Sequence, residues 1–411
     1  MAWAERRKAF EDRLRRSVGW VETTSHVETP AAADDLAVVL DGGGARAAYQ
    51  VGLLRGLVRR HPDLRIPMIT GVSAGAINAS FLAAHQGPLR DAVDELSRMW
   101  AALTVDQVFR VDVPSLASSA FHWGLGLLSG GRVVRPPMRG MVDTAPLRKT
   151  LEDYHGCRGD QPIDGIARNL DCGNLTAIAI VTSSYTTGRT VAWVQGRNVE
   201  EWERPFRLSR RCRLTVDHVM ASAALPLLFP PVQLDGHWYG DGGIRLITPL
   251  SPAVHLGARR IMAFSTRYGR SAQEDRPQVQ GYPPPAQVAG QLLNAVFLDD
   301  LDRDAQTLVR LNLLLEDLPK ERRRGLRVID MVLVRPSQDI GRLAYEYEPR
   351  LPGPLRHMLG GTGAQQTRSS TLLSLLMFDR DYIRRLLDIG EADFEARADD
   401  IDALLARAEV P

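Results

Sequence analysis

A serine between two glycines is the residue of this sequence best suited to act as a nucleophile. Ser73 is the centre of Gly71-Val72-Ser73-Ala74-Gly75, which follows a β-rich run at 66–70 and precedes an alanine-rich segment at 76–85. In this pattern a strained strand-to-helix turn exposes the serine hydroxyl, and the following helix directs its positive end towards the site. A structural turn that happens to contain serine has the same local sequence, so the pattern alone leaves both interpretations open.

A glycine run earlier in the chain is suited to binding negative charge. Gly42-Gly43-Gly44 follows the apolar run 35–40 and opens a helical pattern at 45–60, so its N–H groups can converge on an anionic atom. One interpretation is a dinucleotide loop, with Ala47 as its third small residue and Asp63 as a ribose-binding carboxylate. The other is an oxyanion hole, in which each donor typically contributes ~3 kcal/mol. Ser73 favours the oxyanion hole, because a dinucleotide-binding fold has no use for it.

A carboxylate at the end of a predicted hairpin is the third candidate. The segments 232–234 and 237–239 flank the turn Asp235-Gly236, and Asp241-Gly242-Gly243 follow directly. Two glycines after Asp241 let the backbone turn away and leave the carboxylate at a strand end, where the sites of parallel sheets assemble. Asp-Gly-Gly by itself is usually only a turn.

The elements that position these groups form an α/β pattern. Two strand-turn-helix units in succession predict a parallel sheet flanked by helices. Further strands are predicted at 175–182, 189–195, 260–265 and 328–334, so that the α/β pattern extends to about residue 336.

The regions outside this pattern define the predicted domain organisation. Residues 1–34 are a helical or linker segment, 35–340 a catalytic domain, and 341–411 a helical C-terminal region. Within the catalytic domain, 105–145 is a possible lid insertion and 270–290 a Pro- and Gln-rich surface loop. An apolar stripe in the first segment either packs on the domain or lies on an anionic membrane surface; its residues are Trp3, Phe10, Leu14 and Val18.

Composition excludes several classes of protein. The chain has 411 residues and a formal net charge of +2, with no basic cluster interleaved with aromatics, so nucleic acid is not expected as a partner. Its three cysteines have neither disulfide-framework nor zinc-site spacing. The sequence has no secretory signal and no apolar run of about eighteen residues, so we expect a cytoplasmic protein. It has no calcium loop of the EF-hand type and no metal-ligand cluster, so we expect neither a metal nor another cofactor.

The order of the motifs identifies a family resemblance. The glycine loop, Gly-x-Ser-x-Gly, Ala221-Ser222-Ala223-Ala224-Leu225-Pro226 and Asp241-Gly242-Gly243 together resemble the patatin-like phospholipase family, over roughly residues 36–340. The resemblance implies a three-layer α/β/α sandwich with a mainly parallel sheet. It makes Ser73 the nucleophile and Asp241 its base in a Ser-Asp dyad. The oxyanion hole that it implies is formed by Gly43, Gly44, Ala45 and Arg46.

The resemblance implies a serine acyl hydrolase that cleaves lipid esters through an acyl-enzyme, like a phospholipase A or lysophospholipase. A lipid substrate and peripheral membrane contact follow from it, whereas the lipid class and the oligomeric state do not. The family usually has glycine where this chain has Ala47, which restricts the loop if that position requires a positive φ. The alternative is therefore a weak or inactive acyl-chain-binding protein of the same fold.

A dyad requires an unusual aspartate. Its carboxylate can accept the serine proton if burial raises its pKa, and Trp238 or Phe229 could provide the apolar wall. The competing mechanism is a Ser-His-Asp triad, in which the histidine follows the acid in the chain. His255 and His357 would be its candidates, but neither lies in a distinctive motif. His218 and His237 are interpreted as structural.

Overall fold

The computed structural model describes residues 35–110, 140–269, 300–353, 355–356 and 371–406. The predictions for 1–34 and 270–290, and most of the lid predicted at 105–145, lie outside these residues. His357 lies outside them as well.

The centre of the fold is a run of parallel strands, of which all but the edge strand at 330–334 are fully buried. Their order is β10-β9-β1-β2-β3, and every neighbouring pair is parallel. Strands covered by helices on both faces are expected to be almost continuously apolar, as these are. Their bounds are β1 (Leu36–Leu40), β2 (Met68–Val72), β3 (Ala177–Ser184), β9 (Arg260–Phe264) and β10 (Asp330–Val334).

Antiparallel pairing begins at β3, so the sheet as a whole is mixed. Both β4 and β8 run antiparallel to β3, and β7 and β8 form the hairpin expected from the Asp235-Gly236 turn. The remaining strands are β4 (Thr190–Gly196), β5 (Glu203–Arg204), β6 (Arg207–Arg211), β7 (Val232–Leu234) and β8 (His237–Asp241).

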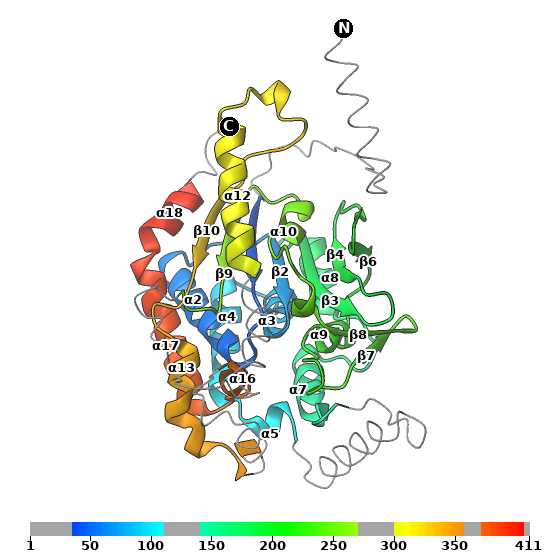
Figure 1. Ribbon diagram of the computed structural model, residues 1–411, viewed down its shortest axis with the longest axis vertical. Helices are drawn as coiled ribbons and strands as arrows, with labels where there is room; N and C mark the ends of the chain where they lie inside the picture. Colours follow the sequence, from blue (N-terminus) through cyan, green and yellow to red (C-terminus); the bar gives the residue numbers. More distant parts are fainter. Residues whose placement is uncertain (1–34, 111–139, 270–299, 354, 357–370, 407–411) are drawn as a thin grey trace, which may run out of the picture.

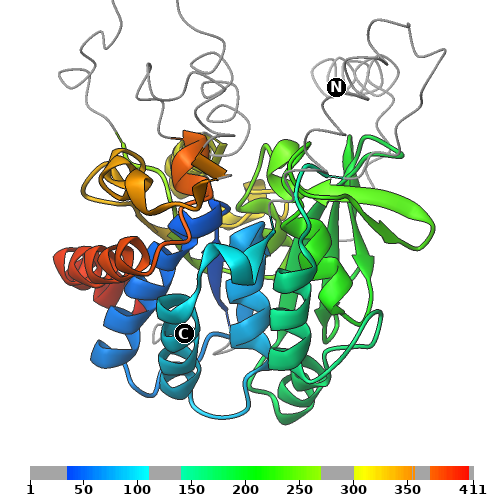
Figure 2. The same ribbon diagram turned by 90° about the horizontal axis from the view of Figure 1, so that it is seen from below.

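Helices cover both faces and complete the predicted three-layer α/β/α sandwich, which is confirmed. Alternation along β1 directs Leu36, Val38 and Leu40 into one core and Ala37 and Val39 into the other. On the first face lie α2 (Ala48–Arg60), α3 (Ala74–Ala84), α4 (Leu89–Ala102), α7 (Ala145–His155), α8 (Asp164–Cys172) and α9 (Val216–Ser222). On the second lie α10 (Ser251–Leu256) and α12 (Asp300–Glu316). Figure 2 shows the first-face helices of the chain's first half, coloured blue to teal, standing side by side.

Short helical segments complete the part of the chain that the structure describes. They are η1 (Gly44–Ala47), α5 (Val105–Val108), η2 (Gly242–Ile244), η3 (Lys320–Arg322), α13 (Ile340–Leu343), η4 (Ala344–Arg350) and α16 (Thr371–Leu375). The last two helices are α17 (Arg380–Ala396) and α18 (Ala398–Ala406), drawn in red in Figure 1 beside α2. Across the described residues, no helix combines the length and apolar character needed to cross a membrane.

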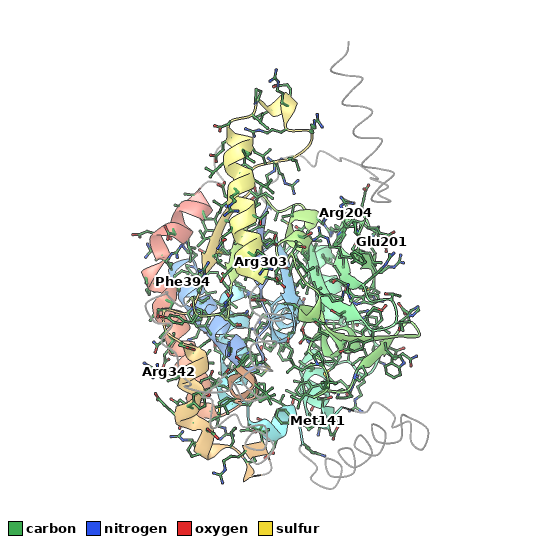
Figure 3. The ribbon with its side chains drawn as sticks, in the orientation of Figure 1. Met141, Glu201, Arg204, Arg303, Arg342 and Phe394 are labelled. Atoms are coloured by element: carbon green, nitrogen blue, oxygen red, sulfur yellow. The ribbon has the colours of Figure 1, made fainter. Side chains whose placement is uncertain are left out.

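The helical C-terminal region packs on the main domain through glycines. A Cβ on Gly52 of α2 would lie 2.1 Å from the carbonyl oxygen of Leu387, and a Cβ on Gly390 of α17 would lie 2.2 Å from that of Tyr49. One turn further along, the ring of Phe394, labelled in Figure 3, occupies the space beside Gly56. The backbones of the two helices therefore approach each other more closely than any side chain would allow.

This contact predicts a large effect of a single methyl group. Gly390→Ala should destabilise the protein by about 3 kcal/mol, because overpacking against rigid backbone forces two helices apart. Gly353 is the matched control: it is helical, and a Cβ there would have no atom within 4 Å. Gly353→Ala should change stability by less than about 1 kcal/mol, since the new methyl group would meet no distant part of the chain and only the following Pro354 disfavours a helical alanine there. Thermal unfolding of both variants tests this, and equal midpoints would contradict the close approach.

Candidate active site

The sheet register brings Ser73 and Asp241 together. Strand β2 occupies one edge of β3 as far as Val72, which pairs with Val181. From the next residue the same edge is occupied by β8, whose Asp241 pairs with Thr182. Two strands that arrive from opposite directions thus end at consecutive positions of β3, so the residue after Val72 lies beside Asp241.

Ser73 has the strained backbone predicted for a serine on a tight strand-to-helix turn. Its φ and ψ are 55° and −129°, which a residue with a side chain adopts only at a cost of ~1–3 kcal/mol. The flanking glycines are required by close approach. A Cβ on Gly75 would lie 2.3 Å from the carbonyl oxygen of Leu40, and a Cβ on Gly71 would lie 2.5 Å from that of Gly75.

The segment 222–224 fixes both residues from one side. The N–H of Ser73 donates a hydrogen bond to Ser222 Oγ at 3.0 Å, and that hydroxyl donates to the carbonyl of Val181 at 2.7 Å. The N–H of Asp241 donates to the carbonyl of Ala224 at 3.0 Å. The Ala-Ser-Ala-Ala sequence at the end of α9 therefore fixes the backbone of Ser73 relative to that of Asp241.

Burial changes the acidity of Asp241. The residue has no exposed surface, and burial raises the pKa of its carboxyl to about 7, although the Ser73 side chain and the N–H of Gly243 act to lower it. Oδ1 accepts the Gly243 N–H at 2.8 Å, whereas Oδ2 has no hydrogen-bond partner among the described residues. Ser73 is thus close enough to influence the carboxyl without full hydrogen-bond geometry, which is common in catalytic sites without ligand.

The prediction that Trp238 forms an apolar wall beside Asp241 is wrong. Side chains alternate along a strand, so Trp238 and Asp241, three positions apart on β8, project to opposite faces. Trp238 remains 48% exposed, whereas Phe229 is buried in a pocket wall. Asp241 is instead enclosed by β3 and the 222–224 segment.

A second buried carboxyl lies at the start of the glycine loop. Asp41 is 6% exposed; its Oδ1 accepts the N–H of Gly42 at 2.8 Å, and its Oδ2 has no partner among the described residues. Burial, with smaller contributions from the charges of Asp302 and Asp241, raises its pKa to about 8. Burial thus favours the protonated form of a second carboxyl close to the glycine loop. Its place directly before the glycines was the only sequence signal that could have marked it.

The glycine loop lies against the serine in a conformation that requires glycine. Gly43 and Gly44 have φ values of 151° and 55°, and a Cβ on Gly44 would lie 2.2 Å from the carbonyl oxygen of Leu375. A Cβ on Gly42 would lie 3.1 Å from the Cβ atom of Ser73. Because the first N–H groups of a helix have no acceptor within it, the amides at the start of η1 are suited to bind an anionic oxygen beside Ser73.

Of the four residues predicted to form the oxyanion hole, Arg46 has a backbone N–H that is already hydrogen-bonded within the loop. Its N–H donates to the carbonyl of Gly43 at 3.1 Å within the turn, and its side-chain Nε donates to Ser374 Oγ at 2.8 Å. Within the described structure, the backbone N–H groups of Gly43, Gly44 and Ala45 donate no such hydrogen bond to a carbonyl group. These three amides are therefore the ones available to bind an anionic oxygen beside Ser73.

Ala47 does not restrict the loop. Its φ and ψ are −66° and −12°, in the right-handed helical region, which alanine adopts without strain. The departure from glycine at this position consequently has no backbone cost, and the reason for expecting a weak or inactive protein does not apply.

An apolar pocket opens on the serine. It encloses about 40 Å³, room for only a few water molecules, so an acyl chain would enter by moving its walls apart. Besides Ser73 and Gly44, its walls come from α3, α4 and the residue after it, α5, α7, the 223–229 segment and the C-terminal region. The residues are Ala74, Ile77, Met99, Trp100, Leu103, Val108, Leu147, Thr150, Leu151, Ala223, Leu225, Phe229, Leu375, Leu376 and Phe378. Nothing in the sequence marked residues 375–378 as part of the site, because a leucine-rich stripe there predicts only helix packing.

The side chains that a Ser-His-Asp triad or a dinucleotide site would require, among the described residues, do not lie at this site. His255 stacks on Trp202 with a ring-centroid distance of 4.3 Å, and burial lowers its pKa to about 4. His218 caps α9. Asp63 precedes β2 and therefore lies at the opposite end of that strand from Ser73, too far away to serve the glycine loop as a ribose ligand. Within the described ranges, no group of His, Cys, Asp or Glu side chains could hold a metal ion.

Comparisons with known proteins give one family match and several structural likenesses. A family model described as patatin-like phospholipase matches residues 38–254, more than half of the chain. No curated protein matches the sequence. Similar solved structures include VipD from Legionella pneumophila, with 12% identity and a TM-score of 0.33, which covers 87% of this chain and 67% of VipD. Human GIVD cytosolic phospholipase A2 has 12% identity and a TM-score of 0.46; 92% of this chain matches 60% of the human one, so the chain spans about three fifths of that protein's length.

Proposed function

Because the chain belongs to the patatin-like phospholipase family, we propose that it hydrolyses lipid esters with Ser73 as nucleophile and Asp241 as general base. Membership of this family supports a lipid hydrolase function. The observation that carries the mechanism is that β2 and β8 end at consecutive positions of β3, which places the strained Ser73 beside the buried carboxyl of Asp241 and next to the glycine loop.

The first half of the reaction transfers the acyl group to the enzyme. Ionised Asp241 takes the proton of the Ser73 hydroxyl as Oγ attacks the ester carbonyl carbon. The negative charge that develops on the carbonyl oxygen is stabilised by the N–H groups of Gly43, Gly44 and Ala45. When the tetrahedral intermediate collapses, the ester C–O bond breaks and the leaving alcohol, a lysolipid or glycerol derivative, takes the proton from Asp241.

The second half releases the acyl group. Asp241 accepts a proton from water, whose oxygen attacks the acyl-Ser73 carbonyl, and the same three amides stabilise the second oxyanion. Collapse returns the proton to Ser73 Oγ and frees the fatty acid. One carboxyl thus alternates between base and acid, which is most effective when its pKa is near the working pH.

The pocket favours an acyl ester as the substrate. Its lining is almost entirely apolar, and among the described residues that line it only Ser73 and Thr150 have hydroxyl side chains. An acyl chain of a lipid would gain favourable transfer free energy there. We propose that the protein reaches such substrates by peripheral contact with a lipid surface, from the cytoplasm.

The pH dependence of the reaction follows from the same carboxyl. Asp241 must be ionised to accept the serine proton, and burial raises its pKa to about 7. We therefore expect kcat to rise as the pH increases through about 7, far above the range of an ordinary aspartate. Initial rates on a neutral short-chain ester between pH 5 and 9 would show this; a rate already constant above pH 5 would contradict a raised pKa.

A fluorophosphonate probe tests the proposed nucleophile directly. Only an activated serine reacts with it, so we expect stoichiometric labelling, located at Ser73 by mass spectrometry and lost in Ser73→Ala. A panel of diacyl phospholipid, lysophospholipid, neutral glyceride and short-chain ester, tested with both proteins, would identify the substrate class. Absence of both labelling and turnover would reject the proposed function.

A further inference from the structure

Two amide side chains are buried between the helix that follows the glycine loop and the helix that follows Ser73. Gln50 belongs to α2 and Asn78 to α3, and neither has exposed surface. Gln50 Nε2 donates to the carbonyl of Asp41 at 2.7 Å and to that of Phe264, at the end of β9, at 3.2 Å. Gln50 therefore fixes the residue that begins the glycine loop to the sheet.

Asn78 completes the arrangement. Its Nδ2 donates to the carbonyl of Ala47 at 3.2 Å and to Gln50 Oε1 at 3.1 Å, and its Oδ1 accepts the indole N–H of Trp100 at 2.8 Å. Every amide hydrogen and both amide oxygens of the pair thus have a partner. The orientation is unambiguous, because an indole N–H can only donate and a carbonyl can only accept.

The bonded atoms lie at both ends of the oxyanion loop. Asp41 and Ala47 flank the loop 42–46, and Asn78 lies on the helix whose N-cap is Ser73. The two ends of the loop are therefore tied, through two adjacent amides, to the helix that carries the nucleophile. Replacing such a buried polar pair by apolar groups of similar shape is often nearly neutral for stability, so the contribution of the pair lies in the geometry that it imposes.

We propose that Gln50 and Asn78 are positioning residues that hold the amides of the glycine loop at the distance from Ser73 Oγ required to bind the oxyanion. This inference rests on the proposed function. An oxyanion donor acts only within about 2.7–3.1 Å of the developing charge, and a misplacement of about 1 Å can cost about 10²-fold in rate. Neither side chain lines the pocket, but Asn78 Oδ1 also accepts the indole N–H of Trp100 in its wall, so the test variant has to keep that bond and change only the bonds to Gln50 and the loop.

The isosteric variant Asn78→Asp tests the proposal. It keeps the size of the side chain but replaces the NH₂ group, which faces two acceptors, by an oxygen. We expect kcat on a short-chain ester to fall about 10- to 100-fold with KM within a factor of about three. The rate of Ser73 labelling by a fluorophosphonate should fall similarly, because the phosphoryl oxygen develops negative charge that the same loop amides would bind. Asn78→Ala is the second variant, should the aspartate prevent folding.

Tyr49→Phe is the matched control for a merely structural role. Tyr49 precedes Gln50 on α2, is fully buried, and donates to Asp393 Oδ2 at 3.0 Å, away from the glycine loop. This variant also loses one buried hydrogen bond, but we expect its kcat to stay within about threefold of wild type. If Asn78→Asp retained its kcat, or if both variants lost activity in proportion to their fall in thermal midpoint, the proposal would be overturned.

Hydrogen exchange gives an outcome that does not depend on turnover. The amides of Gly42 and Arg46, which are hydrogen-bonded within the 41–47 segment, should exchange at least about tenfold faster in Asn78→Asp than in wild type or in Tyr49→Phe. Unchanged exchange would overturn the positioning role, even with an active enzyme. If wild type neither turned over esters nor reacted at Ser73, the proposed function would fail, whereas the exchange result would still decide whether the amide pair orders the loop.

Discussion

Asp241→Asn should lower kcat for ester hydrolysis by about 10²- to 10⁴-fold, the range that a positioned general base contributes. Asparagine has nearly the shape of aspartate and retains an oxygen that can accept the Gly243 N–H, which bonds Oδ1 at 2.8 Å in the wild type. It cannot take up the serine proton. The variant should therefore fold, and its residual rate should lose the rise through about pH 7. Initial rates between pH 5 and 9 would measure both effects.

The stability of this variant gives an independent result. Because burial raises the pKa of Asp241 to about 7, the folded protein binds the proton more tightly than the unfolded chain. The contribution of Asp241 to the free energy of unfolding therefore decreases as the pH rises from about 4 to about 7. The asparagine side chain would not titrate, so Asp241→Asn should gain thermal stability relative to wild type more at pH 8 than at pH 5.

Asp235→Asn is the matched control for this prediction. Asp235 lies in the turn of the same hairpin, is exposed, and has a φ of 48°, which asparagine tolerates well. We expect normal kcat and an unchanged pH profile. Equal losses in the two variants would mean that the hairpin, and not the carboxyl at position 241, determines activity.

Ser73→Ala should abolish turnover, with a loss on the order of 10⁶-fold, the effect of removing a serine nucleophile. Ser73→Gly should be equally inactive yet differ in stability. The φ of 55° is strained for alanine and accessible to glycine, so the glycine variant should be more stable than the alanine variant by roughly 1 kcal/mol. Paired kinetic and unfolding measurements would show whether backbone strain and nucleophile reside at one residue.

Different results would contradict the prediction about the nucleophile and the prediction about backbone strain. Residual turnover of Ser73→Ala above about 1% of wild type would indicate another nucleophile. If the glycine variant were no more stable than the alanine variant, the strained turn would not persist in solution.

Local sequence was sufficient to predict the main helices and strands and to identify the motifs in their order. The strand at 36–40, the glycine loop, the turn at Ser73 and the hairpin before Asp241 each depend on neighbouring residues, because periodicity and turn chemistry act over a few positions. The same is true of the family resemblance, which the family model confirms over residues 38–254. Boundaries differ where helix begins: α2 starts at Ala48, because residues 44–47 form the tighter η1 turn.

Contacts between distant segments decided what the sequence left open. Local sequence indicated that Ser73 and Asp241 could react, but only the shared edge of β3 places them side by side. Burial, which depends on the whole fold, raises the pKa of Asp241. The alternation of side chains along β8 directs Trp238 to the opposite face, so Trp238 does not contribute to that burial. The conformation of Ala47, the pocket wall at 375–378 and the Gln50–Asn78 pair are likewise consequences of packing between segments that are distant in the chain. Residue types set the available chemistry, whereas distance and dielectric environment, which determine whether it can occur, exist only in the folded chain.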